Sequence, residues 1–441
     1  MSTGIINAMS TISQRLDEMV HKHMSKDELI QLALNISRIK SPTGYEKEVG
    51  DFIYQWFQDN GFQPFKQEVY AGRYNVVALL KGTGGGLSLA FNSHMDTKFG
   101  AATDVWAIAE PLRNYYDAWL EDDSLFGQGI LNDKGPMAAW LIAAKAIKNS
   151  GVKLKGDLIL TAVVGEIGGA PIDEFEGPLY HGLGAGTTHL VNHGIVPDYA
   201  LVAECTNFGV SWIASGPAYI KVTVKGLPIY TPNIQRPVEI EKHPNAIVKM
   251  AKVIEAIESW GNAYERENTR ETPCGTIIPK VNIGAIRGGL PPRPSNSSGI
   301  CSIYVDVRIP PYLDLPEVEQ QLREAIKSTK IDADIQTYLF KRGYVGKNTE
   351  GLVKSIEKVH TKVFKEKPGK VIPAIVTMWR DINAFNEFGI PAVTYGPPYH
   401  GGTFLSSMKV DDLFTCSKIY ASLAIEVCNT EKAREIRQAT T

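Results

Sequence analysis

Apolar and polar residues alternate between two patterns along the first half of the chain. Short, almost continuous apolar stretches, typical of buried strands, occur in NVVALLKG, LSLAFNSH, DLILTAVVGE and DYALVAEC. Between the second and third stretch, Met137, Trp140, Leu141 and Ala144 recur at helical spacing behind Pro136, which predicts a helix over residues 135–148. Strands that alternate with helices predict an α/β fold, with a largely parallel mixed sheet and helices on both of its faces.

The pattern changes at about residue 213. The stretch WIASGPAYIKVTVKG predicts a strand and HPNAIVKMAKVIEAIESW a helix; two strands (TIIPKVNIGAI, GICSIYVDVRI), a helix (PEVEQQLREAIKS) and a strand near DADIQTYLF follow. This order predicts an inserted α+β unit of the split-βαβ type, which we place at residues 213–330. Residues 1–212 and 331–441 then form one discontinuous domain.

After the insertion the α/β pattern resumes. We expect a helix over residues 351–364, strands at KVIPAIVT and IPAVTYG, and a closing helix over residues 410–427. Two domains also suit the length, because 441 residues exceed what a single hydrophobic core usually supports.

Composition excludes several classes of protein. The net charge of −2 does not provide the basic surface that nucleic acid requires, and no apolar run approaches the roughly 18 residues of a membrane span. The first residues lack the apolar core of a signal peptide. The five cysteines lie far apart without a CxxC pair, as expected for reduced thiols. We therefore expect a cytoplasmic protein that binds neither nucleic acid nor membrane.

Five acidic or imidazole side chains follow predicted strands or precede the first predicted helix: His94, Asp133, Glu166, Glu204 and His400. Taken singly, each is also an ordinary loop or capping residue. Taken together, two imidazoles and three carboxylates suit Zn²⁺, Mn²⁺ or Co²⁺, and ligands of open α/β sheets gather at the carboxyl ends of strands.

The segments around these residues resemble one family. The order SHMDT, DVWAIAEPL, LFGQGILNDKG, GEIGG, AECTN and YGPPYH is similar to the M20 metallohydrolases, the group of aminoacylase, succinyl-diaminopimelate desuccinylase and carboxypeptidase G2. The resemblance covers nearly the whole chain and makes the insertion a lid or dimerisation domain beside a metal-binding catalytic domain. It implies a homodimer or larger homo-oligomer formed through the lid domain.

The resemblance also assigns roles to the five residues. Asp133 would bridge two metal ions, with His94 and Glu204 completing one site and Glu166 and His400 the other. Asp96 would orient His94.

The sequence departs from the family at its usual pair of adjacent glutamates, a general base followed by a metal ligand. The first position is Gly165, so Glu166 stands alone. Three explanations stay open. In the first, Glu166 is a ligand, and another group or the metal-bound hydroxide suffices. In the second, Glu166 is the base beside one tightly held ion on His94, Asp133 and Glu204, which leaves His400 for substrate or for a weak second ion. In the third, the chain is inactive.

Substrate contacts are expected at three further positions. Arg293 and Arg380 fall in segments that in this family approach the active site, and a guanidinium suits a carboxylate. Tyr230 lies roughly where the family places a lid histidine, or else is a packed loop residue.

These observations predict a metal-dependent hydrolase that cleaves a C–N bond of a small carboxylate-bearing substrate with metal-bound hydroxide, using one or two ions per chain. The default is an amide or N-acyl amino acid. The first alternative is hydrolytic deamination of an amino-aromatic acid, as in the branch of 5-nitroanthranilate aminohydrolase. The second is an inactive homologue that binds a metal or a ligand.

Overall fold

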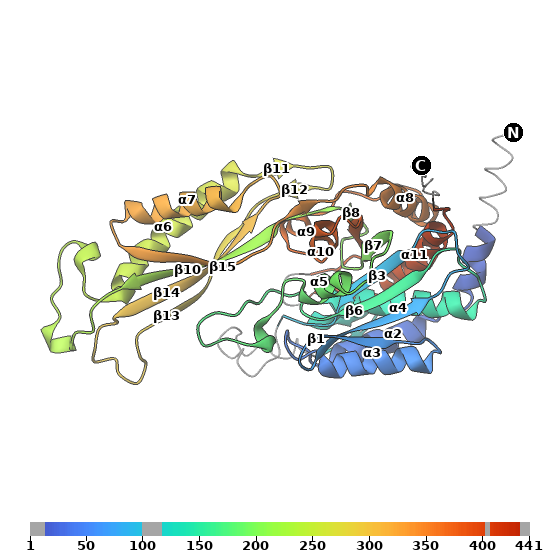
Figure 1. Ribbon diagram of the computed structural model, residues 1–441, viewed down its shortest axis with the longest axis horizontal. Helices are drawn as coiled ribbons and strands as arrows, with labels where there is room; N and C mark the ends of the chain where they lie inside the picture. Colours follow the sequence, from blue (N-terminus) through green and yellow to red (C-terminus); the bar gives the residue numbers. More distant parts are fainter. Residues whose placement is uncertain (1–13, 99–116, 402–405, 433–441) are drawn as a thin grey trace, which may run out of the picture. The chain divides into compact units, whose positions relative to one another are not determined.

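The computed structural model describes residues 14–98, 117–401 and 406–432, which form two compact units (Figure 1). Unit 1 contains the chain up to Trp212, Gly346–Val371 and the chain from Arg380 onward. Unit 2 contains Ile213–Val345 and Ile372–Trp379.

Unit 1 is built on a seven-stranded mixed sheet. In spatial order its strands are β1 (Phe65–Tyr70), β2 (Arg73–Leu80), β6 (Leu158–Val163), β3 (Leu89–His94), β7 (Tyr199–Val202), β17 (Ala392–Tyr395) and β8 (Val210–Ser211). The four central strands β6, β3, β7 and β17 run parallel to one another, whereas β1, β2 and β8 pair antiparallel with their neighbours. The predicted largely parallel mixed sheet is confirmed.

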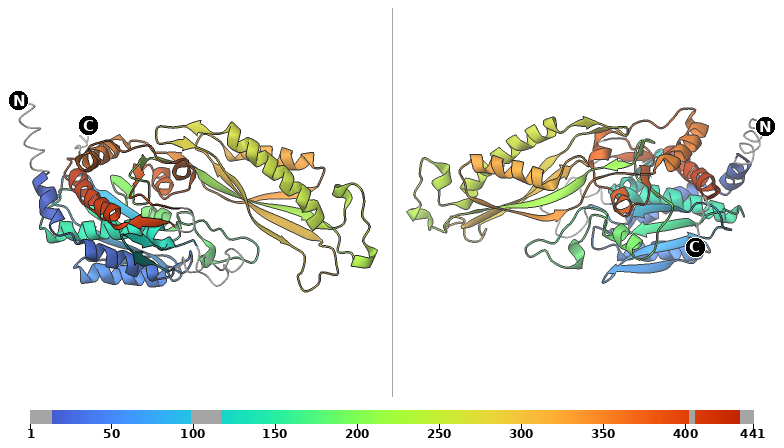
Figure 2. Two further views of the ribbon diagram at one scale, coloured as in Figure 1. Left: turned by 180° about the vertical axis from the view of Figure 1, so that it is seen from behind. Right: turned by 45° about the horizontal axis from the view of Figure 1, so that its top comes forward.

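Helices cover both faces of this sheet. One face carries α2 (Lys26–Arg38), α3 (Lys47–Asp59), α4 (Gly135–Asn149), α8 (Glu350–Phe364) and α11 (Val410–Cys428). The other face carries the shorter helices α5 (Ala185–Asn192) and α10 (Ile382–Glu387). A separate small sheet joins β18 (Ser407–Lys409), β5 (Ser124–Phe126) and β4 (Trp119–Glu121). The long helices α4 and α11 pack against each other, as both views of Figure 2 show.

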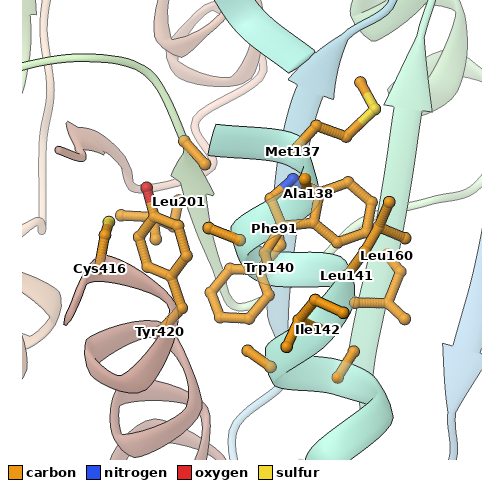
Figure 3. Close-up of a cluster of buried hydrophobic side chains, with 14 of the residues drawn as sticks. Phe91, Met137, Ala138, Trp140, Leu141, Ile142, Leu160, Leu201, Cys416 and Tyr420 are labelled. Atoms are coloured by element: carbon orange, nitrogen blue, oxygen red, sulfur yellow. The ribbon is translucent and has the colours of Figure 1, made fainter. Parts of the chain in front are cut away.

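The core beneath the sheet is formed mainly by aromatic and aliphatic side chains of β3, α4 and α11 (Figure 3). Trp140 is fully buried, stacks at 6.4 Å from Phe57, and donates a hydrogen bond from Nε1 to Ser93 Oγ at 3.0 Å. Phe91 packs at 5.6 Å from Tyr420. Since side chains alternate along a strand, Phe91 and Ser93 face this core, and His94 faces the side of α5 and α10.

Unit 2 is a four-stranded antiparallel sheet with two helices. Its strands, in spatial order, are β13 (Val281–Gly288), β14 (Ile300–Ile309), β10 (Gly216–Lys225) and β15 (Ala333–Phe340). The helices α6 (Ala246–Glu267) and α7 (Leu315–Ser328) pack together over the buried core of this sheet. The chain order β10-α6-β13-β14-α7-β15 is the predicted split-βαβ pattern. Short pairs complete the unit: β9 (Ile213–Ala214) with β16 (Tyr344–Val345), and β11 (Arg270–Glu271) with β12 (Thr276–Ile277).

Two sequence predictions need correction here. The inserted unit was expected to end at residue 330, but β15 pairs with β10, so the unit continues to Val345. The expected strand at KVIPAIVT is the short helix α9 (Pro373–Thr377), which belongs to unit 2. Pro373 occupies the first turn of this helix, where a proline needs no hydrogen-bond partner for its nitrogen.

All five cysteines are buried and form no disulfide. Among the described residues no helix is long and apolar enough to cross a membrane.

Candidate active site

The carboxyl ends of the four parallel strands carry four of the five candidate ligands. His94 is the last residue of β3, and Glu166, Glu204 and His400 follow β6, β7 and β17. Asp133 comes from the turn Ile130–Lys134, which leads into α4. The predicted position of the site, at one edge of the sheet, agrees with this topology.

His94 is held at both ring nitrogens. Its Nδ1 lies 2.9 Å from the backbone oxygen of Asp96 and 3.3 Å from Asp96 Oδ1. Its Nε2 lies 2.9 Å from the amide oxygen of Asn132 and 3.7 Å from Glu166 Oε2. The ring therefore points its Nε2 toward Asn132 and Glu166, while Asp96 contacts its Nδ1.

Asp96 also ties three segments together. Its Oδ2 accepts hydrogen bonds from Thr43 Oγ1 at 2.8 Å and from the backbone N–H of Ile167 at 3.0 Å. Its Oδ1 accepts the N–H of Glu166 at 3.1 Å. A fully buried carboxylate is stable when donors surround it in this way. Asp96 thus positions the Glu166 backbone as well as His94.

Asp133 is fully buried, and neither of its carboxylate oxygens makes a hydrogen bond to a described residue. Leaving a buried carboxylate without a donor is costly. The preceding residue, Asn132, is the one whose side chain meets His94. Among the described residues, nothing therefore competes with a cation for the two oxygens of Asp133.

Glu204 has a different partner. It forms a buried ion pair with the guanidinium of Arg380, which lies just before α10. Both side chains are almost inaccessible, at 7% and 4% exposure respectively. Glu204 Oε1 has no hydrogen-bond partner among the described residues.

His400 lies apart from this buried group. Its side chain is 51% exposed, and its Nε2 is 3.5 Å from Asp412 Oδ2 on α11. Its backbone pairs with Ser407 in an isolated bridge. The structure therefore brings His94 and Glu166 together with Asp133 in electrostatic range, pairs Glu204 with an arginine, and leaves His400 beside an exposed carboxylate.

Gly165 shows why Glu166 has no acidic neighbour. Gly165 has φ of +64°, and a Cβ placed on it would lie 2.8 Å from Arg73 Nη2 and 3.0 Å from the carbonyl oxygen of His181. Arg73 is itself buried, forms an ion pair with Glu46, and donates from Nη1 to the carbonyls of Pro178 and His181. A guanidinium thus fills the space beside the position that the family's general base usually holds.

The charged groups of the site and their burial shift one another's pKa values. Burial alone lowers the pKa of His94, but Asp96, Glu166 and Asp133 raise it well above its ordinary value. Burial raises the pKa of Asp133 strongly, although His94 acts in the opposite direction. Burial likewise raises the pKa of Glu166 to about 7, against the effect of His94. These shifts describe a pocket with more carboxylate than positive charge, which favours a cation.

Two other predicted contacts lie in unit 2. Tyr230 is 57% exposed and its backbone forms a bridge with Asn296. Arg293 is exposed in the turn that follows β13. Neither residue is a core residue of unit 2, and both side chains are open to a ligand.

Asp381 completes the surroundings of the site and was not predicted. Its Oδ2 accepts hydrogen bonds from Asn92 Nδ2 at 3.0 Å and Thr187 Oγ1 at 2.8 Å, and its Oδ1 has no described partner. Burial raises its pKa to about 6. Asp381 directly follows Arg380 and is the N-cap residue of α10, a helix that the sequence pattern did not predict.

The residues fit a divalent cation only in part. The donor types suit it, and the orphaned oxygens of Asp133 mark where a positive charge is lacking. Within the described ranges, however, no three His, Cys, Asp or Glu side chains already surround one point as a metal site does. Of the five candidate ligands, His94 and Glu166 lie 3.7 Å apart, and Asp133 lies within electrostatic range of His94.

Comparison with known proteins extends this description. The model of peptidase family M20/M25/M40 matches residues 90–426, which include every candidate ligand. The chain belongs to this family. M20 proteins are hydrolases that act on amide and related C–N bonds, so the predicted family and enzyme class are confirmed.

The following relatives are distant in sequence but match more than nine-tenths of the chain. An N-formyl-4-amino-5-aminomethyl-2-methylpyrimidine deformylase of Bacillus subtilis is 25% identical over 449 residues, covering 95% of this M20 chain and 98% of the relative. A di-peptidase of Saccharomyces cerevisiae superposes with a TM-score of 0.69 at 10% identity, covering 95% and 99%. An M20 metallo-carboxypeptidase of Sulfolobus solfataricus gives 0.65 at 14% identity, covering 91% and 99%. These two structures show the shared fold.

Proposed function

We propose that this M20 protein hydrolyses an amide C–N bond of a small carboxylate-bearing substrate with the help of a divalent metal ion. The observation that carries the proposal is the buried group of His94, Asp133 and Glu166 at the carboxyl ends of the parallel strands. In this group, Asp96 fixes the imidazole and both oxygens of Asp133 lack a donor. An inactive homologue would have no need for an orphaned buried carboxylate.

His94 and Asp133 would hold the ion, which can be Zn²⁺, Mn²⁺ or Co²⁺ by its donor set. When bound, it would supply Lewis acidity for the attacked carbonyl and for the attacking water. Asp96 keeps Nδ1 of the imidazole engaged, so that Nε2 is the nitrogen that faces the ion.

Glu166 would take the proton of the attacking water and pass it to the leaving nitrogen. Its carboxylate lies 3.7 Å from His94 Nε2, and its backbone N–H is anchored on Asp96. The side chain is therefore close to the reacting centre and carried by a fixed turn. Position 165 supplies no second general base, because it is a glycine and Arg73 occupies the space beside it.

The substrate class follows from the relatives and from exposed side chains. The name of the Bacillus subtilis relative describes the removal of an N-formyl group from an aminopyrimidine, which supports an N-acyl amine as substrate. Arg293 and Tyr230 of unit 2 remain our proposed substrate contacts, the arginine for a carboxylate. Arg380, also predicted as a contact, is engaged by Glu204.

A product assay tests the proposal. The purified protein, with Zn²⁺, Mn²⁺ or Co²⁺ added in turn, is given N-formyl and N-acetyl derivatives of amino acids and of aminopyrimidines, and formate, acetate and ammonia are measured. We expect acid release that depends on metal. Ammonia release from amino-aromatic acids alone would instead establish the deamination alternative, and ligand binding without any product would establish the inactive one.

Two variants separate the roles. His94→Ala should lose the ion and the activity together, whereas Glu166→Gln should keep the ion and lose at least about 100-fold in kcat. His193→Ala, an exposed histidine at the end of α5, is the matched control and should behave as wild type. If Glu166→Gln abolishes binding of the ion, Glu166 is a ligand and another group moves the proton.

We also propose a homodimer or larger homo-oligomer formed through unit 2. The strand β13 lies at the edge of its sheet, and Ile286 on it is 55% exposed. An unpaired edge with an exposed apolar residue favours pairing with a second copy. Light scattering of wild type against Ile286→Lys tests this. The buried free cysteines support our placement of the protein in the cytoplasm.

A further inference from the structure

The buried ion pair between Glu204 and Arg380 is the feature of the site that the proposed reaction does not use. Glu204 follows β7, at the same sheet edge as His94 and Glu166. Arg380 reaches this edge from the start of α10 and lies within electrostatic range of Glu166 and Asp133 as well. The guanidinium of Arg380, which stays charged, therefore lies among the buried acidic side chains of the site.

Arg380 carries a positive charge, and its ion pair with Glu204 holds the side chain in place. Both members of the pair are more than nine-tenths buried. Once a buried pair has formed, removing one partner leaves an uncompensated charge in a region of low dielectric, so the pair is hard to separate. A divalent ion bound to Glu204 would have to displace the guanidinium or accept a like charge beside it.

The fifth candidate ligand does not compensate for Glu204. His400 is half-exposed, and the neighbour of its Nε2 is Asp412. A second ion would thus find at Glu204 only Oε1, because Oε2 is paired with the guanidinium, and His400 is paired with the exposed Asp412. The remaining donors, centred on His94 and Asp133, are enough for one ion.

We infer that the Arg380 guanidinium takes the place of a second metal ion, so that the site binds a single divalent ion and Glu204 is the partner of the arginine. This inference rests on the proposed function, because it concerns how many ions that metal site holds. It assigns Arg380 a charge-balancing role within the site in addition to any effect on the substrate. Glu204 accordingly becomes a positioning residue for Arg380.

The test is the number of ions bound per chain. The full chain is loaded with Zn²⁺, desalted, and analysed by elemental mass spectrometry. We expect a single ion for wild type and for Arg380→Lys, which keeps the charge. Arg380→Met, which removes the charge at similar volume, should bind a second ion. Arg308→Met is the matched control, since it removes an arginine that pairs with Asp306 at 2.8 Å in unit 2, and it should bind one ion.

A second variant keeps the test decisive if Arg380→Met does not fold. Glu204→Gln should still bind its single ion, because Glu204 is not a ligand in this arrangement. Loss of that ion in Glu204→Gln, or two ions in wild type with no change in Arg380→Met, overturns the inference and leaves the metal-dependent reaction in place. Failure of wild type to bind any ion overturns both.

Discussion

A substitution at Gly165 tests whether the buried Arg73 closes the space beside this residue. We consider Gly165→Ala, the smallest side chain that the position can receive. The glycine has φ of +64°, which favours residues without a Cβ. The added Cβ would lie 2.8 Å from Arg73 Nη2 and 3.0 Å from the carbonyl oxygen of His181. Contacts this short require one of these two groups to move.

Neither group can move freely. Arg73 Nε donates to Glu46 Oε2 at 2.9 Å, and its Nη1 donates to the carbonyl oxygens of Pro178 at 2.6 Å and His181 at 2.7 Å. The positive φ alone costs an alanine about 1 kcal/mol. Loosening one charged hydrogen bond of the buried arginine adds about 1.5–3 kcal/mol. We therefore expect Gly165→Ala to lower the free energy of unfolding by about 2.5–4 kcal/mol.

A second glycine supplies the matched control. Gly151 has φ of +73°, and a Cβ placed on it would meet nothing within 4 Å. Gly151→Ala should therefore lose only the conformational part, about 1 kcal/mol. Denaturant unfolding of both variants, followed by tryptophan fluorescence, measures the difference. Equal losses in the two variants would refute the claim that Arg73 closes the space beside Gly165.

Three further measurements examine other parts of unit 1. Asp96→Asn should weaken metal binding by about 10- to 100-fold, because it disturbs the carboxylate that orients His94; competition with a chelating dye measures this, and unchanged affinity contradicts it. Burial lowers the pKa of His360 below its ordinary 6.5, so the unfolded chain binds the proton more readily and stability should fall as pH drops through about 6.5. His360→Gln should reduce this dependence in unfolding midpoints taken from pH 5 to 8; an unaltered profile argues against it. Trp140→Ala should cost about 3–5 kcal/mol, from a large cavity and the lost bond to Ser93; a calorimetric loss under about 1 kcal/mol would be inconsistent with this packing.

The fold was predictable where one pattern dominates a segment. The apolar runs of β3, β6 and β7 are long enough to mark buried strands, and Pro136 marks the start of α4. The pattern failed at α9, where KVIPAIVT is apolar enough for a strand and only Pro373 argues for a helix start. The end of unit 2 was placed too early, at residue 330, although the strand near DADIQTYLF was already counted in its split-βαβ order; this strand is β15, which pairs with β10.

The location of the candidate site could be predicted from the sequence, and so could some of its residues. Parallel strands place their carboxyl ends at one edge, so residues after β3, β6 and β7 had to come close together. The same argument does not say which of these side chains point toward one another. Asn132 and Asp133 are adjacent in one turn, yet the contact with His94 is made by Asn132. The orientation within such a turn depends on backbone angles that residue types do not reveal.

The two arginines explain why the departures from the family could not be interpreted from the sequence alone. Arg73 is 92 residues before Gly165 in the chain, and Arg380 is far beyond Glu204, so neither pairing has a local signal. In each case a buried guanidinium lies beside a position to which the resemblance gives another role: the usual general base at position 165, and a metal ligand at Glu204. Both arginines are buried and ion-paired, so each supports the site by fixed charge. Gly165 and the buried Arg73 thus belong together: a Cβ at this position would already lie 2.8 Å from Arg73 Nη2, so we expect Gly165→Glu to crowd the guanidinium and not to create a general base.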